Sequence, residues 1–193
     1  MFPILSSLII LPLIGSIFLI FIKSSDKNTS LKYVALFITF VNFFLSLYLW
    51  KIFDPSISAF QFVENRIWIE GFINYKVGID GISILFVILT TFISPLCIIS
   101  VNSTITYRLK EFLIAILILE TLMIGVFCSL DLVIFYLFFE GGLIPMFLII
   151  GIWGGNRRVY SAFKFFLFTL VGSVLMLVAI IAIYWISGTT DVE

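Results

Sequence analysis

The chain has 193 residues, of which 62% are hydrophobic and only 11% are charged, and its formal net charge is zero. Soluble domains have about 45–50% apolar and about 25% charged residues, so this composition indicates a polytopic membrane protein. A neutral chain without a basic patch excludes a nucleic-acid-binding surface, which needs clustered Lys and Arg. His is absent, and Cys97 and Cys128 lie in apolar stretches without a CxxC pattern, so we predict no metal site.

Apolar stretches divide the chain into six predicted transmembrane helices, at about 20 residues per crossing. The first stretch lacks a basic start and a small-residue cleavage site, so we predict a retained helix and not a signal peptide. The fold class is therefore all-α, with about six transmembrane helices. The predicted spans are residues 2–22, 33–49, 81–101, 112–129, 132–152 and 160–186.

A loop of about 30 residues between the second and third spans is the only sizeable predicted extramembrane segment. Residues 72–80 in it alternate polar and apolar side chains, and the apolar segment 67–69 precedes them across Glu70 and Gly71. Period-two alternation on either side of a short turn is typical of a β-hairpin. We predict an extramembrane hairpin that covers the helix ends, with a binding loop as the alternative.

Lys and Arg residues are concentrated in the loops on one side of the predicted membrane. Cytoplasmic loops carry an excess of these residues, so this side is predicted to be cytoplasmic or mitochondrial-matrix, and both termini lie on the opposite face. The seven basic residues on the predicted cytoplasmic side are Lys23, Lys27, Lys32, Arg108, Lys110, Arg157 and Arg158.

Three ionisable residues lie within the predicted spans. Glu120 and Glu140 each follow an acidic residue at the span start by nine positions, so both lie about 13 Å deep, near the membrane midplane. Lys164 lies only about 9 Å inside the basic face, from which its side chain can reach the interface. A buried charge in a bilayer is costly, and such acids often belong to proton or ion routes. Glu120 and Glu140 are therefore the candidate proton-transfer residues, with Lys164 as a possible modulator.

The residues after Glu140 predict a local break in its helix. Gly141 and Gly142 remove side-chain bulk, and Pro145 has no amide hydrogen to donate to the Gly141 carbonyl. Unpaired backbone inside a bilayer is tolerated where it lines a protein-enclosed or hydrated cavity. This pattern suits water beside a titratable group.

Each of these residues also has a purely structural interpretation. Glu140 can be a protonated acid that bonds a neighbouring helix, and Glu120, beside Thr121, can make a similar interhelical contact. Lys164 lies among Phe residues near an interface, where it can simply anchor the helix end.

Four segments in the second half of the chain carry specific motifs, at residues 125–132, 139–146, 151–155 and 157–166. These motifs resemble chain M (chain 4 in mitochondria) of respiratory complex I, the proton-pumping NADH:quinone oxidoreductase. The acid followed by Leu-Ile-Pro-Met is more similar to chain M than to its sister antiporter-like chains. Residues 77–83 look like the segment of that family that enters helix 3, and the similarity extends over essentially the whole sequence.

The resemblance implies a subunit of the complex I membrane arm, in which a helix-5 Glu pairs with a Lys on helix 7. Glu140 matches that helix-5 position, and Glu120 matches the acidic position on helix 4. Lys164 lies in the sixth span, so the resemblance does not give it the role of the helix-7 Lys. Residues 1–110 are then leader helices with the hairpin loop, and residues 111–193 are part of the first antiporter-like repeat.

Family members have about fourteen helices, whereas six are predicted here. A transporter of this design needs its partner helices, so the chain is expected to be truncated or one product of a split gene, and not to pump alone. Expected partners are the lipid bilayer, the missing carboxy-terminal half and the other membrane-arm subunits. The resemblance implies no cofactor in this chain, because other subunits bind NAD, FMN, iron–sulfur clusters and quinone. The location is then the bacterial or mitochondrial inner membrane.

Two further functions stay open at this point. The chain can be a subunit of a related multisubunit cation/proton antiporter or of a membrane-bound hydrogenase, where the same Glu140 serves without NADH. It can also be a structural or assembly membrane subunit without transport, for which Glu140→Gln leaves proton pumping unchanged.

Overall fold

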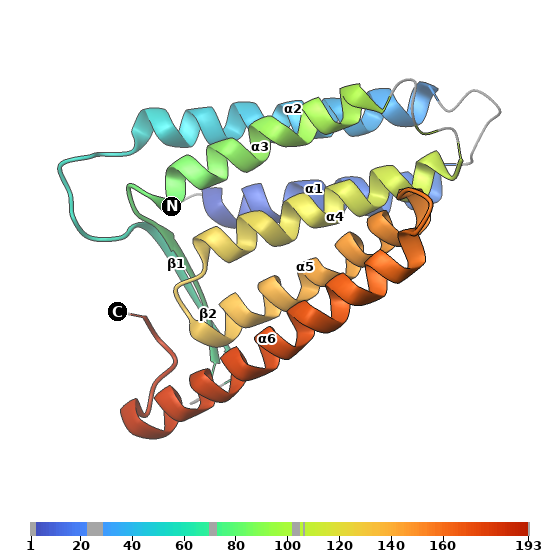
Figure 1. The fold of residues 1–193 in the computed structure, drawn as a ribbon. Coiled ribbons are helices and arrows are strands. Elements are labelled where there is room, and N and C mark those ends of the chain that lie inside the picture. The colour runs from blue at the N-terminus through green and yellow to red at the C-terminus, as the bar shows by residue number, and fades with distance from the viewer. Residues whose placement is uncertain (1–2, 23–28, 70–72, 102–104, 106, 193) are drawn as a thin grey trace.

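The computed structural model describes residues 3–22, 29–69, 73–101, 105 and 107–192. Six helices and one pair of strands make up this part of the chain, in an order that follows the predicted one (Figure 1). The elements are α1 (Ile4–Phe21), α2 (Thr29–Ile52), β1 (Gln61–Ile69), β2 (Ile73–Ile79), α3 (Ser83–Ser100), α4 (Leu109–Cys128), α5 (Leu132–Trp153) and α6 (Arg158–Ser187).

All six helices are long and apolar enough to cross a membrane. The predicted all-α, polytopic fold with a small extramembrane hairpin is therefore confirmed. The largest difference is at α2, which begins four residues before the predicted span and ends three residues after it. Polar residues at both ends of α2 continue the helix beyond its apolar segment, so hydropathy alone underestimates its length.

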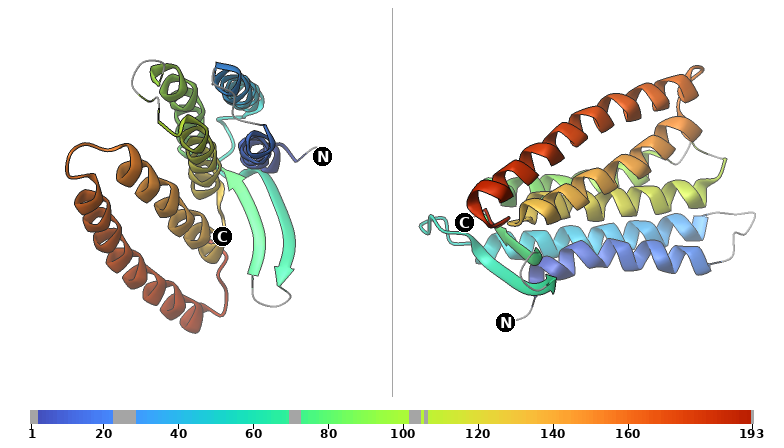
Figure 2. Two further views of the ribbon diagram at one scale, coloured as in Figure 1. Left: turned by 90° about the vertical axis from the view of Figure 1, so that its right-hand side faces the viewer. Right: turned by 90° about the horizontal axis from the view of Figure 1, so that it is seen from below.

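Four helices form a bundle, and α5 and α6 stand to one side of it (Figure 2). In the bundle α1 packs against α4 and α2 packs against α3, while α5 joins the bundle through α4. α6 packs chiefly against α5, and most of its surface is exposed. The two predicted parts of the chain, 1–110 and 111–193, thus meet where α1, α2 and α3 pack against α4. The boundary between the two parts stays a prediction.

Two apolar clusters fill the bundle, one at each end. The cluster near the hairpin joins α1, α3 and α4 to β2, and it includes Leu8, Val77, Val87 and Ile124, each fully buried or nearly so. The cluster at the opposite end joins all four helices α1, α2, α3 and α4, and it includes Leu19, Leu113 and Leu117. Between them lies a layer of buried polar side chains, described below.

The hairpin pairs β1 and β2 in antiparallel register, with Arg66 opposite Tyr75 and Asn65 opposite Lys76. Both described ends of the chain lie at the same end of the helices as this hairpin (Figure 1). β1 begins at Gln61, six residues before the predicted strand, because residues 61–66 lack the clean alternation that the prediction required. The predicted turn at Glu70 and Gly71 lies outside the described residues.

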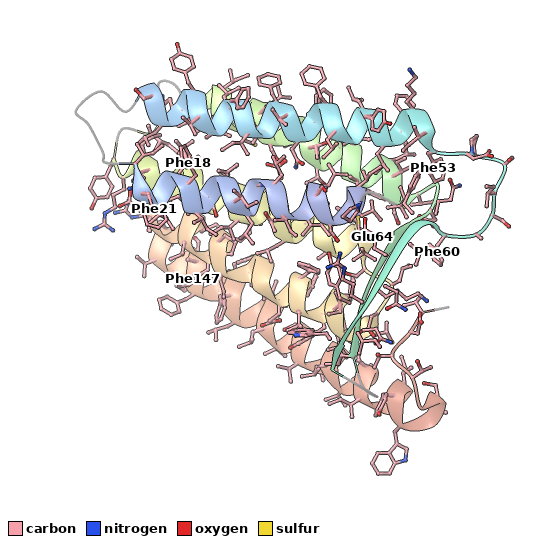
Figure 3. The ribbon with its side chains drawn as sticks, turned by 180° about the vertical axis from the view of Figure 1, so that it is seen from behind. Phe18, Phe21, Phe53, Phe60, Glu64 and Phe147 are labelled. Atoms are coloured by element: carbon pink, nitrogen blue, oxygen red, sulfur yellow. The ribbon has the colours of Figure 1, made fainter. Side chains whose placement is uncertain are left out.

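The hairpin also completes the start of α1. The Glu64 carboxylate accepts hydrogen bonds from the backbone amides of Leu5, at 3.0 Å, and Ser6, at 3.2 Å, and from the Ser6 hydroxyl (Figure 3). The first amides of a helix have no partner within the helix, and a carboxylate there also complements the helix dipole. A residue of the loop thus fixes the first transmembrane helix.

The segment after α6 folds back over the start of α5. Gly188 adopts φ 73°, a left-handed conformation that glycine reaches without strain, and its amide donates to the Tyr184 carbonyl at 2.8 Å. Thr190 then makes two hydrogen bonds to the start of α5. Its carbonyl accepts from the Leu132 amide at 2.9 Å, and its hydroxyl donates to the Asp131 carboxylate at 2.6 Å. The chain therefore returns to the hairpin face and closes the α5–α6 pair.

Candidate functional site

Glu120 lies on α4 inside the bundle, with 2% of its surface exposed. The side-chain amide of Asn42 on α2 donates a hydrogen bond to Glu120 Oε1 at 2.8 Å. Asn42 is itself fully buried. The structure thus places the predicted acid in a polar contact between two helices, away from lipid.

Other buried polar groups surround this pair at similar depth. The hydroxyls of Ser46 on α2 and Thr91 on α3 lie 2.7 Å apart, and both residues are fully buried. Ser94, one turn after Thr91, is also buried, and its hydroxyl donates to the Thr90 carbonyl of the same helix at 3.0 Å. Three helices therefore contribute to one polar layer between the two apolar clusters.

Sequence analysis did not identify Asn42, Ser46, Thr91 or Ser94. A usable signal was present, because Asn42 and Ser46 are four residues apart and so face one side of α2, and Thr91 and Ser94 do the same on α3. Amide and hydroxyl side chains on one face of a membrane helix indicate contact with another helix. Ionisable residues alone do not reveal this layer.

Glu140 occupies a different environment on α5. Its side chain is partly exposed, but the Oε2 atom is buried and has no hydrogen-bond partner among the described residues. Gly141 lies against Leu122 of α4, where an added Cβ would approach the Leu122 side chain to 3.1 Å, whereas Gly142 faces open space. Glu140 therefore lies at the edge of the contact between α5 and α4. One side of α5 at this level packs against α4, and the other side is not covered by described residues.

The predicted local break at Glu140 is wrong, because α5 is a continuous helix from Leu132 to Trp153. Pro145 is buried within it. Proline removes one hydrogen bond from a helix, but neighbouring helices and local adjustment compensate in membrane proteins. Thus α5 stays helical around Glu140 even though Pro145 has no amide hydrogen to donate.

The two acids project from adjacent helices at the same level. Glu120 is eight residues before the end of α4 at Cys128, and Glu140 is eight residues after the start of α5 at Leu132, so each is about 12 Å from the hairpin end of its helix. No hydrogen bond joins the two carboxyls among the described residues. The structure brings them to one depth but does not pair them.

Lys164 lies in the second turn of α6, and its side chain is exposed. Within the described part of the chain, the ion pair present is that of Lys76 with Asp191, outside the membrane. Lys164 forms no ion pair with Glu140 there, so its role as a modulator stays a prediction.

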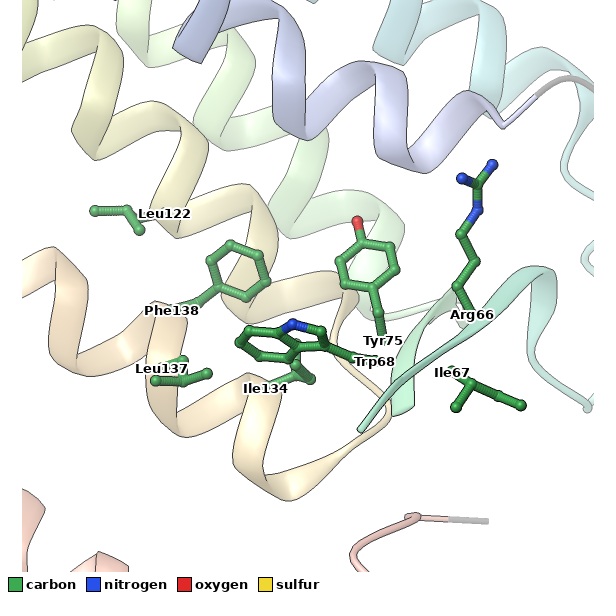
Figure 4. Close-up of a pocket in the computed structure, with 8 residues that line it drawn as sticks. All are labelled: Arg66, Ile67, Trp68, Tyr75, Leu122, Ile134, Leu137 and Phe138. Carbon is green, nitrogen blue, oxygen red and sulfur yellow. The ribbon is translucent and has the colours of Figure 1, made fainter. Parts of the chain in front are cut away.

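A shallow pocket of about 500 Å³ opens beneath the hairpin, next to the start of α5 (Figure 4). Trp68 and Tyr75 from the hairpin, with Phe138 and Leu137 of α5, make it mostly apolar, and Arg66 stands at its rim. No group of three or more His, Cys, Asp or Glu residues suited to a metal ion occurs in the described chain.

Comparison with known proteins connects this arrangement with respiratory enzymes. The family described as "NADH:quinone oxidoreductase/Mrp antiporter, TM" matches residues 129–193. The chain is 62% identical over 169 residues to NADH-quinone oxidoreductase subunit M of Rhodobacter capsulatus, covering 88% of this chain and 32% of the relative. It is 50% identical over 191 residues to NADH-ubiquinone oxidoreductase chain 4 of Arabidopsis thaliana, covering 98% of this chain and 38% of the relative.

Solved structures give the same result for the fold. A chain in respiratory complex I from Thermus thermophilus matches with a TM-score of 0.82 and 27% identity, over 97% of this chain and 38% of that chain. A chain of the Mrp complex from Dietzia sp. matches with a TM-score of 0.76 and 16% identity, over 97% of this chain and 20% of that one, which is a likeness of fold alone. The chain spans between about a third and two fifths of the length of the curated relatives named above.

Proposed function

Because the chain belongs to the family of NADH-quinone oxidoreductase subunit M and NADH-ubiquinone oxidoreductase chain 4, we propose that it contributes two buried acids to a proton path of such a complex. Glu140 accepts and releases a proton within the membrane, and Glu120 is a second proton-holding group beside it. NADH oxidation and quinone reduction take place in other subunits and drive the transfer. The chain supplies only part of the path.

The observation that carries this proposal is the placement of Glu120 and Glu140 at one depth on adjacent helices. A carboxyl group held in a bilayer needs a compensating role, and proton relays are the usual one. Each acid keeps one buried oxygen, Oε2, without a partner among the described residues. An atom that is free of structural hydrogen bonds is available to bind and release a proton.

We further propose the setting in which this path operates. The hairpin and both termini face the periplasm or intermembrane space, because the basic loops mark the other face as cytoplasmic or matrix. The partners are other membrane-arm subunits and a segment that supplies the remaining helices of the longer relatives. NAD, FMN, iron–sulfur clusters and quinone are bound outside this chain. The membrane is the inner membrane of a bacterium or of a mitochondrion.

Glu140→Gln in the assembled complex tests the proposal. We expect proton pumping in membrane vesicles to fall about tenfold or more per NADH oxidised, since a positioned acid or base contributes about 10²–10⁴-fold to a proton transfer. NADH oxidation with an artificial electron acceptor reports assembly separately. Glu111→Gln is the matched control, because Glu111 is exposed in the first turn of α4.

Unchanged pumping in Glu140→Gln, with assembly intact, would favour the structural role instead. Pumping or cation exchange that is lost in this variant but independent of NADH would favour a cation/proton antiporter or a hydrogenase. The 62% identity to a subunit M sequence favours the NADH-linked complex over both.

A further inference from the structure

Asn42 and Glu120 form a buried pair whose hydrogen bonds are incomplete. One bond joins them, from Asn42 Nδ2 to Glu120 Oε1 at 2.8 Å. The other oxygen of each side chain, Asn42 Oδ1 and Glu120 Oε2, is buried and without a partner among the described residues. Leaving a polar atom unpaired away from water is costly, so this pair requires an explanation.

Both unpaired atoms are acceptors when Glu120 is ionised, so they cannot bond each other in that state. A proton on Oε2 changes this, because a protonated carboxyl group carries one O–H donor. A carboxylic acid and a primary amide can then make two hydrogen bonds, N–H to carboxyl oxygen and O–H to amide oxygen. One proton thus satisfies both free atoms.

No charge near Glu120 provides another solution. Asn42 of α2 donates the hydrogen bond that its carboxyl accepts, and no ion pair involves Glu120 among the described residues. The helices packed against α4 carry titratable groups elsewhere along their length, among them Lys32, Tyr33, Tyr48 and Lys51 of α2, Cys97 of α3, and Tyr136 and Glu140 of α5, whereas α1 has none. The hydrogen bond of the buried Glu120 carboxyl is therefore with a neutral side chain, that of Asn42.

We propose that Asn42 is the positioning residue for the Glu120 proton, an inference that rests on the proposed role of Glu120 in proton transfer. The Asn42 amide N–H holds Oε1, and the amide oxygen accepts the Oε2–H bond when Glu120 is protonated. On release, the proton passes from Oε2 to a water molecule, the hydrogen bond to Asn42 Oδ1 breaks, and the bond from Nδ2 to Oε1 remains. Asn42 thereby sets which oxygen carries the proton.

The neighbouring polar residue on α2 differs from Asn42 in this respect. Thr39 is also fully buried, but its hydroxyl donates to the Leu36 carbonyl of the same helix at 3.0 Å. Its hydroxyl is therefore paired within α2, and it hydrogen-bonds no carboxyl group among the described residues. Thr39→Val, which keeps the shape of the side chain, is therefore the matched control for Asn42→Leu.

Infrared spectroscopy of the assembled complex in membranes tests this inference. We expect a protonated-carboxyl band that disappears in Glu120→Gln. In Asn42→Leu this band should move to higher frequency, because its O–H has lost an acceptor. Thr39→Val should match the wild type. A Glu120 band that is absent at every pH of active enzyme, or one that Asn42→Leu leaves unchanged, would overturn the inference.

A second pair of variants applies even if Asn42→Leu does not assemble. The Gln side chain in Glu120→Gln has a donor in place of Oε2–H, so it can make both hydrogen bonds to Asn42 and should keep the thermal stability of the wild type. Glu120→Leu should be clearly less stable. Equal destabilisation by both variants would contradict the paired arrangement.

The infrared result and the pumping result can fail independently. Normal pumping in Glu140→Gln would contradict the proposed function. The infrared band of Glu120 and its shift in Asn42→Leu would still support the pairing of Asn42 with Glu120. Loss of pumping in Glu140→Gln with an unshifted Glu120 band would leave the function and remove the role of Asn42.

Discussion

Lys76 on β2 and Asp191 near the end of the chain form a two-point ion pair, with the Lys76 ammonium 2.8 Å and 2.7 Å from the two carboxylate oxygens. Lys76 is 7% exposed, so its charge is largely removed from water. The pair joins the extramembrane hairpin to the segment that returns from α6. It is the charged part of the closure that also includes Asp131 and Thr190.

Asp191→Asn should destabilise the protein by about 1–3 kcal/mol, because it leaves the buried Lys76 ammonium without its carboxylate. The free energy of unfolding in mixed micelles, followed by circular dichroism, measures the effect. Val192→Thr at the neighbouring exposed position is the control and should change little. An Asp191→Asn variant as stable as the control would show that solvent screens this pair.

Asp131→Ala should cost about 0.5–2 kcal/mol through the lost helix cap alone. The Asp131 carboxylate accepts from the amides of Val133 at 2.9 Å and Ile134 at 3.1 Å, so its removal exposes the start of α5. Asp131→Asn keeps a capping oxygen and should cost less. The melting temperatures of Asp131→Ala and Asp131→Asn distinguish the contribution of the capping hydrogen bonds from that of the charge. Equal decreases in melting temperature would argue against a contribution from the cap.

Gly125→Ala should destabilise the α4–α5 contact by about 1–3 kcal/mol, since overpacking forces neighbours out of place. An added Cβ at Gly125 would approach the Phe138 ring to 2.5 Å, whereas Gly142→Ala meets nothing within 4 Å. The Gly142 variant should be neutral or more stable, because alanine is the better helix former. Comparing the melting temperatures of both variants tests this, and equal values would mean that Phe138 moves aside.

Asp80 should make the start of α3 sensitive to acid. Its carboxylate accepts from the Ser83 amide at 2.7 Å, and this bond, together with that of the Ser83 side chain, holds the pKa of Asp80 below its usual 3.8. A lowered pKa in the folded state stabilises it above pH 3.8, and this contribution is lost as the pH falls through the folded value. Melting temperatures of wild type and Asp80→Asn should therefore differ at pH 7 and converge toward pH 3. A constant difference across this range would contradict the prediction.

Hydropathy was sufficient to predict the six helices because each crossing is a local, nearly continuous apolar segment. The sequence also placed Glu120 and Glu140 at the depth at which α4 and α5 hold them. The predicted helix break around Glu140 is wrong, because α5 packs against two neighbouring helices, which compensate for the hydrogen bond that Pro145 removes. The roles of Glu120 and Glu140 in proton transfer, and the role of Lys164 as a modulator, stay predictions.

The partners of Glu120 were not predictable in the same way. Asn42 is 78 residues away from it in the chain, and their contact depends on how α2 and α4 pack, which apolar composition does not specify. Polar residues such as Ser46 and Thr91 are common in membrane helices and are not unusual singly. They indicate a functional site only when the structure shows that they form one buried polar layer with Asn42 and Glu120.

The hydrogen bonds at the hairpin face also constrain the order of biosynthesis. The Leu5 amide and Glu64 are 59 residues apart, and so are Asp131 and Thr190. Helices α1 and α5 are therefore each made by the ribosome long before the side chain or segment that completes their first turn. During translation these two helices therefore stay in the translocon or in lipid without the final hydrogen bonds at their amino-terminal ends. A translational pause after either helix would prolong this state and expose the nascent helix to misinsertion.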